Sequence, residues 1–215
     1  MREGYATIGL FLALLAAPAC QAGLHRTAEG TLDEHGLTVL VHQNRFHPIF
    51  FDEKNAAIQV ILHDERIATD GEIRLGPAPE QWDPIPLFES RGDGDAPDQL
   101  RVRSGYPGHD LHYTTEVTPE PGGFRIAVHL DAPLPKDLEG KAGFNLDFLP
   151  TAYFGKGFLM GSAPGTFPRS AQGPMDPRAP GDPLPLASGA TTITLAPEDP
   201  LVRVSITSDG ATLAL

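Results

Sequence analysis

The sequence is poor in cysteine, in tryptophan and in positive charge, and these shortages exclude several classes of protein. One Cys among 215 residues excludes an internal disulfide and any zinc site built from clustered cysteines. Lys and Arg number 16 against 28 Asp and Glu, which gives a net charge of −12 with no basic stripe. Such a chain is repelled by phosphate backbones, so the composition argues against nucleic-acid binding. We also find no amphipathic run long enough for a substantial helix.

Glycine and proline, by contrast, are abundant. The 23 Gly and 22 Pro make up about one residue in five, too many for a helical bundle. Hydrophobic residues are 40% of the chain, enough to bury a core, so global disorder is excluded. The composition therefore predicts an acidic, turn-rich globular protein.

The first twenty residues have the pattern of an export signal. Residues 6–17 are almost purely apolar but too short to span a bilayer, which excludes a transmembrane segment here. Small residues follow, with Ala17 and Ala19 before Cys20, so we predict a signal peptide over 1–19. Cys20 is then a candidate for lipidation; the alternative is a signal without lipid, with cleavage before Cys20 or after Ala22. Both predict an exported protein that is periplasmic, secreted or lipid-anchored to the outer membrane.

Period-two alternation of apolar and polar residues dominates the rest of the chain. In a strand, successive side chains point to opposite faces, so alternation predicts strands with one buried and one solvated face. Frequent Gly and Pro turn signals separate these segments. The pattern predicts an all-β fold, an antiparallel β-sandwich of the immunoglobulin-like or a related type with about 8–11 strands. The alternating segments are 37–42, 58–63, 100–103, 113–117, 124–131, 144–149 and 201–207.

Domain boundaries follow from the same pattern. We expect a flexible N-terminal segment over 20–35 and a β-sandwich domain over 36–215. Two proline-rich stretches, 76–98 and 161–185, have little periodicity and are predicted to be long loops. Residues 212–215 look like the start of a return strand, and we expect the sequence to continue into a downstream domain.

Several phrases resemble one family. The N-terminal β-sandwich region of bacterial secreted glycoside hydrolases related to family 9, the cellulase-like enzymes, is similar from about residue 36 to the end. The phrases that carry this resemblance are residues 80–86, 140–150, 152–156, 167–169 with 173–175, and 195–200.

The resemblance implies that the sandwich precedes a catalytic (α/α)6 barrel, which carries an Asp pair and a distant Glu acid. This sequence has neither the Asp-Ala-Gly-Asp motif of that barrel nor a helical repeat, so no catalytic residue is carried over. The family's inverting hydrolysis needs two carboxyl systems about 6.5–9.5 Å apart across a sugar. The resemblance therefore implies a non-catalytic domain, without cofactor, whose partners are a downstream catalytic domain and β-glucan or a related polysaccharide.

Five residues are candidates for contact with sugar or with the catalytic domain. Trp82, with Glu80 and Asp83 beside it, could stack on a sugar face while the acids bind its hydroxyls, or could instead fill an apolar site. Tyr153 and Lys156 lie in a second phrase that mixes aromatic rings with a base, and packing is the favoured role there.

Two further motifs, a histidine pair and a tripeptide, suggest a function but also have ordinary structural explanations. His109 and His112 have the spacing of metal ligands on a helix, but the segment after them is predicted as strand, where such residues point to opposite faces. We therefore predict no metal site. The tripeptide 91–93 spells Arg-Gly-Asp, but it lies in a turn-rich stretch where such residues occur for backbone reasons.

The sequence thus predicts a non-catalytic accessory domain of a secreted family 9-like glycoside hydrolase that braces or docks the catalytic barrel. The alternatives are a stand-alone carbohydrate-binding module, which would need a strip of exposed aromatic rings, and a structural outer-membrane lipoprotein, which rests on Cys20.

Overall fold

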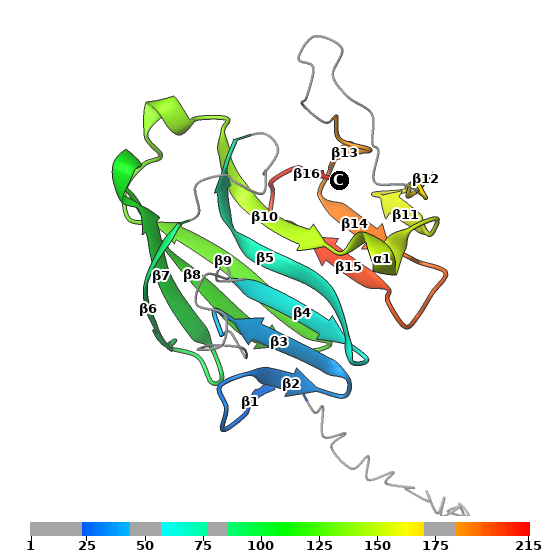
Figure 1. The fold of residues 1–215 in the computed structure, drawn as a ribbon, viewed down its shortest axis with the longest axis horizontal. Helices are drawn as coiled ribbons and strands as arrows, with labels where there is room; N and C mark the ends of the chain where they lie inside the picture. Colours follow the sequence, from blue (N-terminus) through cyan, green and yellow to red (C-terminus); the bar gives the residue numbers. More distant parts are fainter. Residues whose placement is uncertain (1–22, 44–56, 77–85, 170–183) are drawn as a thin grey trace, which may run out of the picture.

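The computed structural model describes residues 23–43, 57–76, 86–169 and 184–215. Within these ranges the chain is almost entirely antiparallel β-structure, arranged in three sheets and a two-stranded ribbon (Figure 1). The expected all-β sandwich class is therefore confirmed. The described ranges contain sixteen strands, of which eight have five residues or more. The signal segment, Cys20, Glu80, Trp82 and Asp83 lie outside them.

The first sheet has six strands in the order β1-β2-β3-β4-β5-β10. It begins with Leu24 and Leu32 already buried, so the fold starts earlier than the expected boundary at residue 36. The sequence predicts a flexible segment over 20–35. The strands found there are too short to show an alternation of apolar and polar residues. The strands are β1 (His25–Arg26), β2 (Leu32–Glu34), β3 (Leu37–Val41), β4 (Ile58–Leu62), β5 (Glu65–Leu75) and β10 (Ala142–Phe148).

The second sheet is a four-stranded meander in the order β6-β7-β8-β9. Its edge strand β6 lies inside the stretch 76–98 that we expected to be a loop. The prediction failed because β6 is mostly exposed and therefore shows no apolar alternation. The strands are β6 (Leu87–Asp93), β7 (Leu100–Tyr106), β8 (Leu111–Glu120) and β9 (Gly123–Leu130), with short 3-10 turns η1 (Pro107–His109) and η2 (Lys136–Leu138).

The third sheet, ordered β12-β11-β14-β15, follows the single short helix of the described residues, α1 (Pro150–Tyr153). Strand β12 falls within the expected loop 161–185, and as an edge strand it tolerates Pro164. The expected strand over 201–207 begins only at Val204, because residues 199–202 form a turn. The strands are β11 (Gly157–Met160), β12 (Ala163–Thr166), β14 (Thr192–Leu195) and β15 (Val204–Thr207).

The last strand does not return along β15. Strand β16 (Leu213–Ala214) pairs instead with β13 (Ser188–Ala190), and the Leu215 N–H donates to the Ala187 carbonyl at 2.9 Å. The final residues therefore form a separate two-stranded ribbon beside the third sheet (Figure 1).

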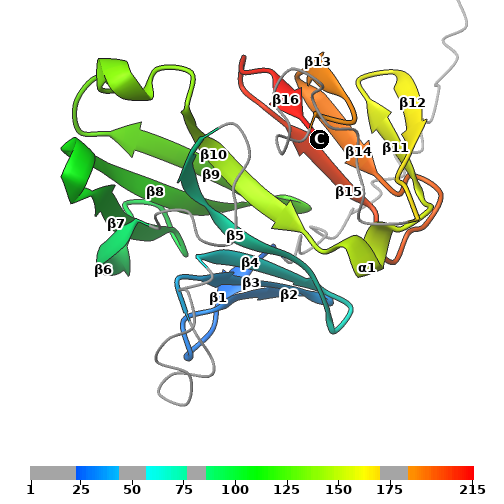
Figure 2. The same ribbon diagram turned by 45° about the horizontal axis from the view of Figure 1, so that its top comes forward.

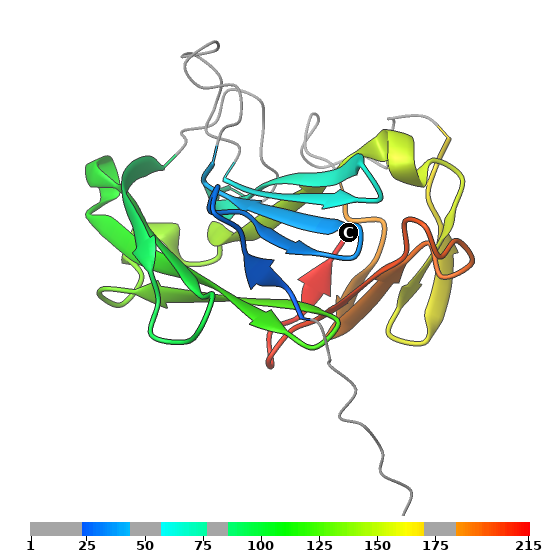
Figure 3. The ribbon, with the colours of Figure 1, turned by 90° about the horizontal axis from the view of Figure 1, so that it is seen from below.

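The second and third sheets both lie on one side of the first sheet (Figures 2 and 3). Alternation in β3 explains the packing on the second sheet, because Val39 and Val41 point inward to meet Val102 and Val117. The third sheet packs on the other end of the same face, through Val60 and its neighbours. The first sheet thus forms the shared base of the molecule.

The outward face of the second sheet carries a network of ion pairs. Arg101 binds both Asp95 and Glu116 at 2.6 Å, and Arg103 binds Asp131 and also Glu89. These hydrogen bonds from arginine hold the pKa values of Asp95, Glu116 and Asp131 below their ordinary range. A carboxyl group whose folded-state pKa is lowered stabilises the fold above its ordinary pKa, and this contribution is lost as the pH falls through the lowered value.

We therefore expect Arg101→Gln to lower the thermal unfolding midpoint at pH 7 and to change it much less at an acidic pH below the lowered pKa values, where these carboxyl groups are protonated in both proteins. Arg125→Gln is the control, since Arg125 meets Glu120 in a single exposed pair and such pairs contribute little. Unfolding followed by circular dichroism at both pH values measures the difference. An equally large loss at both pH values would show that the network does not act through these charges.

Candidate functional site

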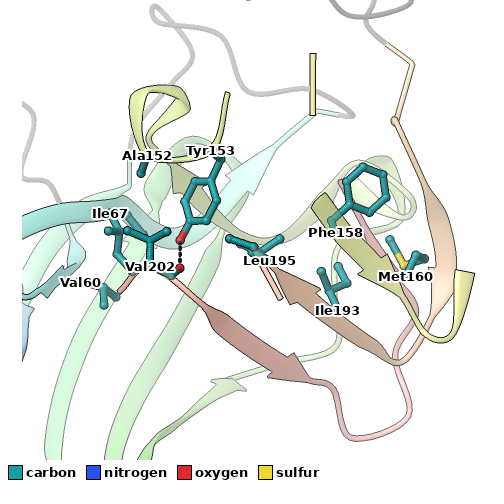
Figure 4. Close-up of a cluster of buried hydrophobic side chains, with 11 residues drawn as sticks. Val60, Ile67, Ala152, Tyr153, Phe158, Met160, Ile193, Leu195 and Val202 are labelled. Atoms are coloured by element: carbon teal, nitrogen blue, oxygen red, sulfur yellow. Dashed lines mark hydrogen bonds between the residues drawn. The ribbon is translucent and has the colours of Figure 1, made fainter. Parts of the chain in front are cut away.

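Four of the five phrases that carry the family resemblance converge on one place. Residues 140–150 supply β10 and the turn into α1, residues 152–156 supply α1 and its exit, residue 167 follows β12, and residues 195–200 form the turn after β14. These segments meet in one buried apolar cluster (Figure 4), which we call the junction cluster. The fifth phrase, 80–86, lies outside the described residues except for Pro86, and so do residues 173–175, the second half of the fourth phrase.

Tyr153 is the centre of the junction cluster and only 3% of it is exposed. Its hydroxyl donates to the Val202 carbonyl at 3.0 Å (Figure 4). Its ring meets Phe148 edge-on, with 5.7 Å between centroids, and Phe167 at 5.8 Å. Burial, with a smaller effect of Glu65, raises the pKa of Tyr153, so its hydroxyl keeps the proton that it donates. Tyr153 thus joins α1 to the turn before β15, and its ring does not face solvent.

Lys156, the second candidate in this part of the chain, is half-buried and pairs with Asp199. The pair lies 43 residues apart in the sequence and ties the start of β11 to the turn after β14. Asp199 also accepts the Leu201 N–H at 3.1 Å, and Glu198 accepts the Gly157 N–H at 2.7 Å. These bonds lower the pKa values of both carboxyl groups, which are therefore ionised and occupied by structural partners.

The turn between β14 and β15 is strained where it begins. Ala196 is fully buried and has φ +45°, a left-handed conformation that is costly for a residue with a Cβ. Its N–H donates to the Gly157 carbonyl at 2.9 Å, which helps to hold this conformation. The surrounding packing therefore fixes the turn that carries Glu198 and Asp199, as expected for strain that persists in a folded protein.

Gly165 is sensitive to substitution, because its backbone lies close to an aromatic ring of the junction cluster. A Cβ at Gly165 would overlap the ring of Phe158, which is itself buried against Phe167 with 5.0 Å between centroids. We expect Gly165→Ala to destabilise the protein by about 2 kcal/mol through overpacking. Gly143→Ala is the control because a Cβ at Gly143 meets open space on β10, and its free energy of unfolding should be unchanged or slightly higher. Urea denaturation compares the two, and equal stabilities would show that the ring can move aside.

The remaining motifs have structural partners rather than a shared site. His109 lies 3.4 Å from Asp137, whereas His112 lies 2.7 Å from Glu89. The described ranges hold no group of three or more His, Cys, Asp or Glu side chains that could bind a metal ion.

The arginine of the Arg-Gly-Asp tripeptide is committed to the fold. Arg91 Nε donates to the Val41 carbonyl at 2.8 Å, and Nη2 donates to the Gly30 carbonyl at 2.5 Å. Gly30 has φ +82°, a conformation that favours glycine, and a Cβ there would lie 3.4 Å from the guanidinium nitrogens. Arg91 thus ties the edge strand β6 to the first sheet, a role that the tripeptide itself does not signal.

No family model, curated protein or solved structure matches the chain. Among the described residues, no helix is both long and apolar enough to cross a membrane.

Proposed function

We propose that this chain is a non-catalytic accessory β-sandwich of a secreted family 9-like glycoside hydrolase, exported by its N-terminal signal, and that it braces the catalytic barrel of that enzyme. The observation that carries the proposal is the convergence of the resembling phrases in the junction cluster. Among the described residues, those that the resemblance shares are used for packing and for fixing turns. This is the behaviour of a structural module, not of a catalytic centre.

The charged residues of the cluster support the same role. Lys156 and Asp199 neutralise each other, and Glu198 is bonded to a backbone N–H. An acid and a base poised for glycoside hydrolysis would need carboxyl groups free to face a sugar and a water.

The proposal is tested with the purified chain alone. In a reducing-sugar assay on soluble β-glucan, we expect no turnover. Hydrolysis at an enzyme-like rate that survives further purification would refute the non-catalytic role. Affinity electrophoresis in gels that contain the same glucan tests the carbohydrate-binding alternative, for which the chain would be retarded; the accessory role predicts unchanged migration.

A further inference from the structure

The edge strand β6 is held against the first sheet at a contact that contains a buried ring nitrogen. His42 directly follows β3, and its ring stacks on Phe88 of β6 with 5.8 Å between ring centroids. The residue is half-buried, but its Nδ1 atom is shielded from solvent and has no hydrogen-bond partner among the described residues. Arg91 of β6 reaches the same place, where its Nε donates to the Val41 carbonyl. A histidine and an arginine therefore share this contact.

The backbone sets the position of His42. Its φ is +47°, in the left-handed region that few residues with a Cβ adopt. Its N–H donates to the Ala57 carbonyl at 2.7 Å. Such a conformation persists only where the surrounding structure enforces it, so the ring is kept beside β6 by the fold of the chain.

The contact disfavours protonation of His42. A protonated imidazole needs acceptors for two N–H groups, and Nδ1 has none among the described residues. The proton would also add a second positive charge beside the guanidinium of Arg91. Burial, with a smaller effect of Arg91, accordingly lowers the pKa of His42 to about 4. The ring stays neutral in mild acid, in which a histidine exposed to water is protonated.

The other charged groups of the contact do not offset this effect. Burial and Arg26 of β1 lower the pKa of Arg91, and Asp93 of β6 opposes them. Asp93 is itself paired with Arg26, and the Asp98 carboxylate accepts the Arg26 N–H. Among the described residues, Arg91 is the only charged group that acts on His42. A proton on His42 would therefore lack a carboxylate partner among these residues.

We propose that the contact between β6 and the first sheet is an acid-sensitive latch, in which the neutral ring of His42 keeps β6 in place and protonation of that ring releases the strand. Release moves the imidazolium into water and away from Arg91. Without its ties to the first sheet, β6 is held only by its bulged pairing with β7, and most of its residues are already exposed. The opening is therefore local, as expected for an edge strand with few buried contacts. The inference is independent of the proposed function.

The direction of the pH dependence follows from proton linkage. The open state binds a proton with the ordinary affinity of a histidine, near pH 6.5, whereas the closed state does so only near pH 4. The closed state is therefore favoured less and less as the pH falls through this interval. Between pH 7 and pH 5 we expect the fraction of open β6 to rise by about tenfold or more.

The test is hydrogen–deuterium exchange of the full chain at pH 7 and pH 5, measured by mass spectrometry and corrected for the intrinsic pH dependence of amide exchange. Protection of β6 should fall about tenfold or more at pH 5, while β8 keeps its protection. His42→Asn removes the titrating ring and keeps a residue type that accepts the left-handed region, so its β6 protection should not depend on pH over this range. The matched control is His35→Asn, because His35 also has a positive φ, +37°, but its side chain is 78% exposed. This variant should respond to pH as the unsubstituted chain does.

No effect of pH on the protection of β6 would overturn the latch. An equal loss of protection in β6 and β8 would overturn it as well, because it indicates global unfolding. An unchanged pH response in His42→Asn would assign the response to another group. A nuclear magnetic resonance titration of the unsubstituted chain needs no variant: the latch predicts that His42 takes up its proton well below pH 6.5, and a midpoint near that value would contradict it. Circular dichroism checks that each variant is folded.

Discussion

Tyr153→Ala is expected to cost about 4 kcal/mol of unfolding free energy, the range for removing a large buried aromatic side chain. The substitution removes the ring contacts with Phe148 and Phe167 and leaves the Val202 carbonyl without its donor. Tyr153→Phe keeps the ring and is expected to lose only about 1 kcal/mol, the contribution of one buried hydrogen bond. Urea denaturation followed by tryptophan fluorescence and by circular dichroism measures both changes.

The adjacent residue is the control for this experiment. Phe154 is 42% exposed, so Phe154→Ala should change the free energy of unfolding by less than about 1 kcal/mol. If Phe154→Ala and Tyr153→Ala were equally destabilising, the assignment of Tyr153 to the interior and of Phe154 to the surface would be wrong.

Arg91→Met is expected to destabilise the protein by about 3 kcal/mol. The substitution keeps the apolar stem but removes the donors to the Val41 and Gly30 carbonyls, and hydrogen bonds to a charged group contribute about 1.5–3 kcal/mol each. Arg91→Lys should recover only part of this loss, because an ammonium group cannot reproduce the two-sided geometry of a guanidinium. Chemical denaturation measures the series.

Arg125→Met is the matched control, because Arg125 on β9 is exposed and, among the described residues, pairs only with the exposed Glu120 at the end of β8. Its effect should be within about 0.5 kcal/mol. A similarly small effect at Arg91 would contradict the role of that side chain in holding β6 against the first sheet.

The alternation of apolar and polar residues predicted most of the long strands, because successive residues of a strand face opposite sides of the sheet and only one side is buried. Leu100 and Val102 on β7 show this clearly, since both are buried and Arg101 between them is not. Two edge strands do not show this alternation and were not predicted. Strand β6 buries little, and β12 contains Pro164 and Gly165, so both resembled loops.

The junction cluster could be predicted only in part. The resemblance marked the segments, and Tyr153 and Lys156 were among the candidates. Their hydrogen-bond partners could not be predicted, because Val202 and Asp199 lie 49 and 43 residues away in the sequence and no local pattern encodes such pairs. The arginine ladder of the second sheet, with Arg101 and Arg103 two residues apart on the polar face of an alternating strand, was accessible to sequence reasoning in principle.

Our proposal is that the chain stabilises a hydrolase and does not hydrolyse glycan itself. It is tested most directly by measuring residual β-glucan hydrolysis after heating the family 9-like catalytic domain with and without an excess of the chain. We expect the mixture to keep activity at a temperature at which the catalytic domain alone loses it, since a partner that binds only the folded state of a protein stabilises that state. Equal inactivation of the catalytic domain with and without the chain, when the chain is itself folded at that temperature, would contradict it.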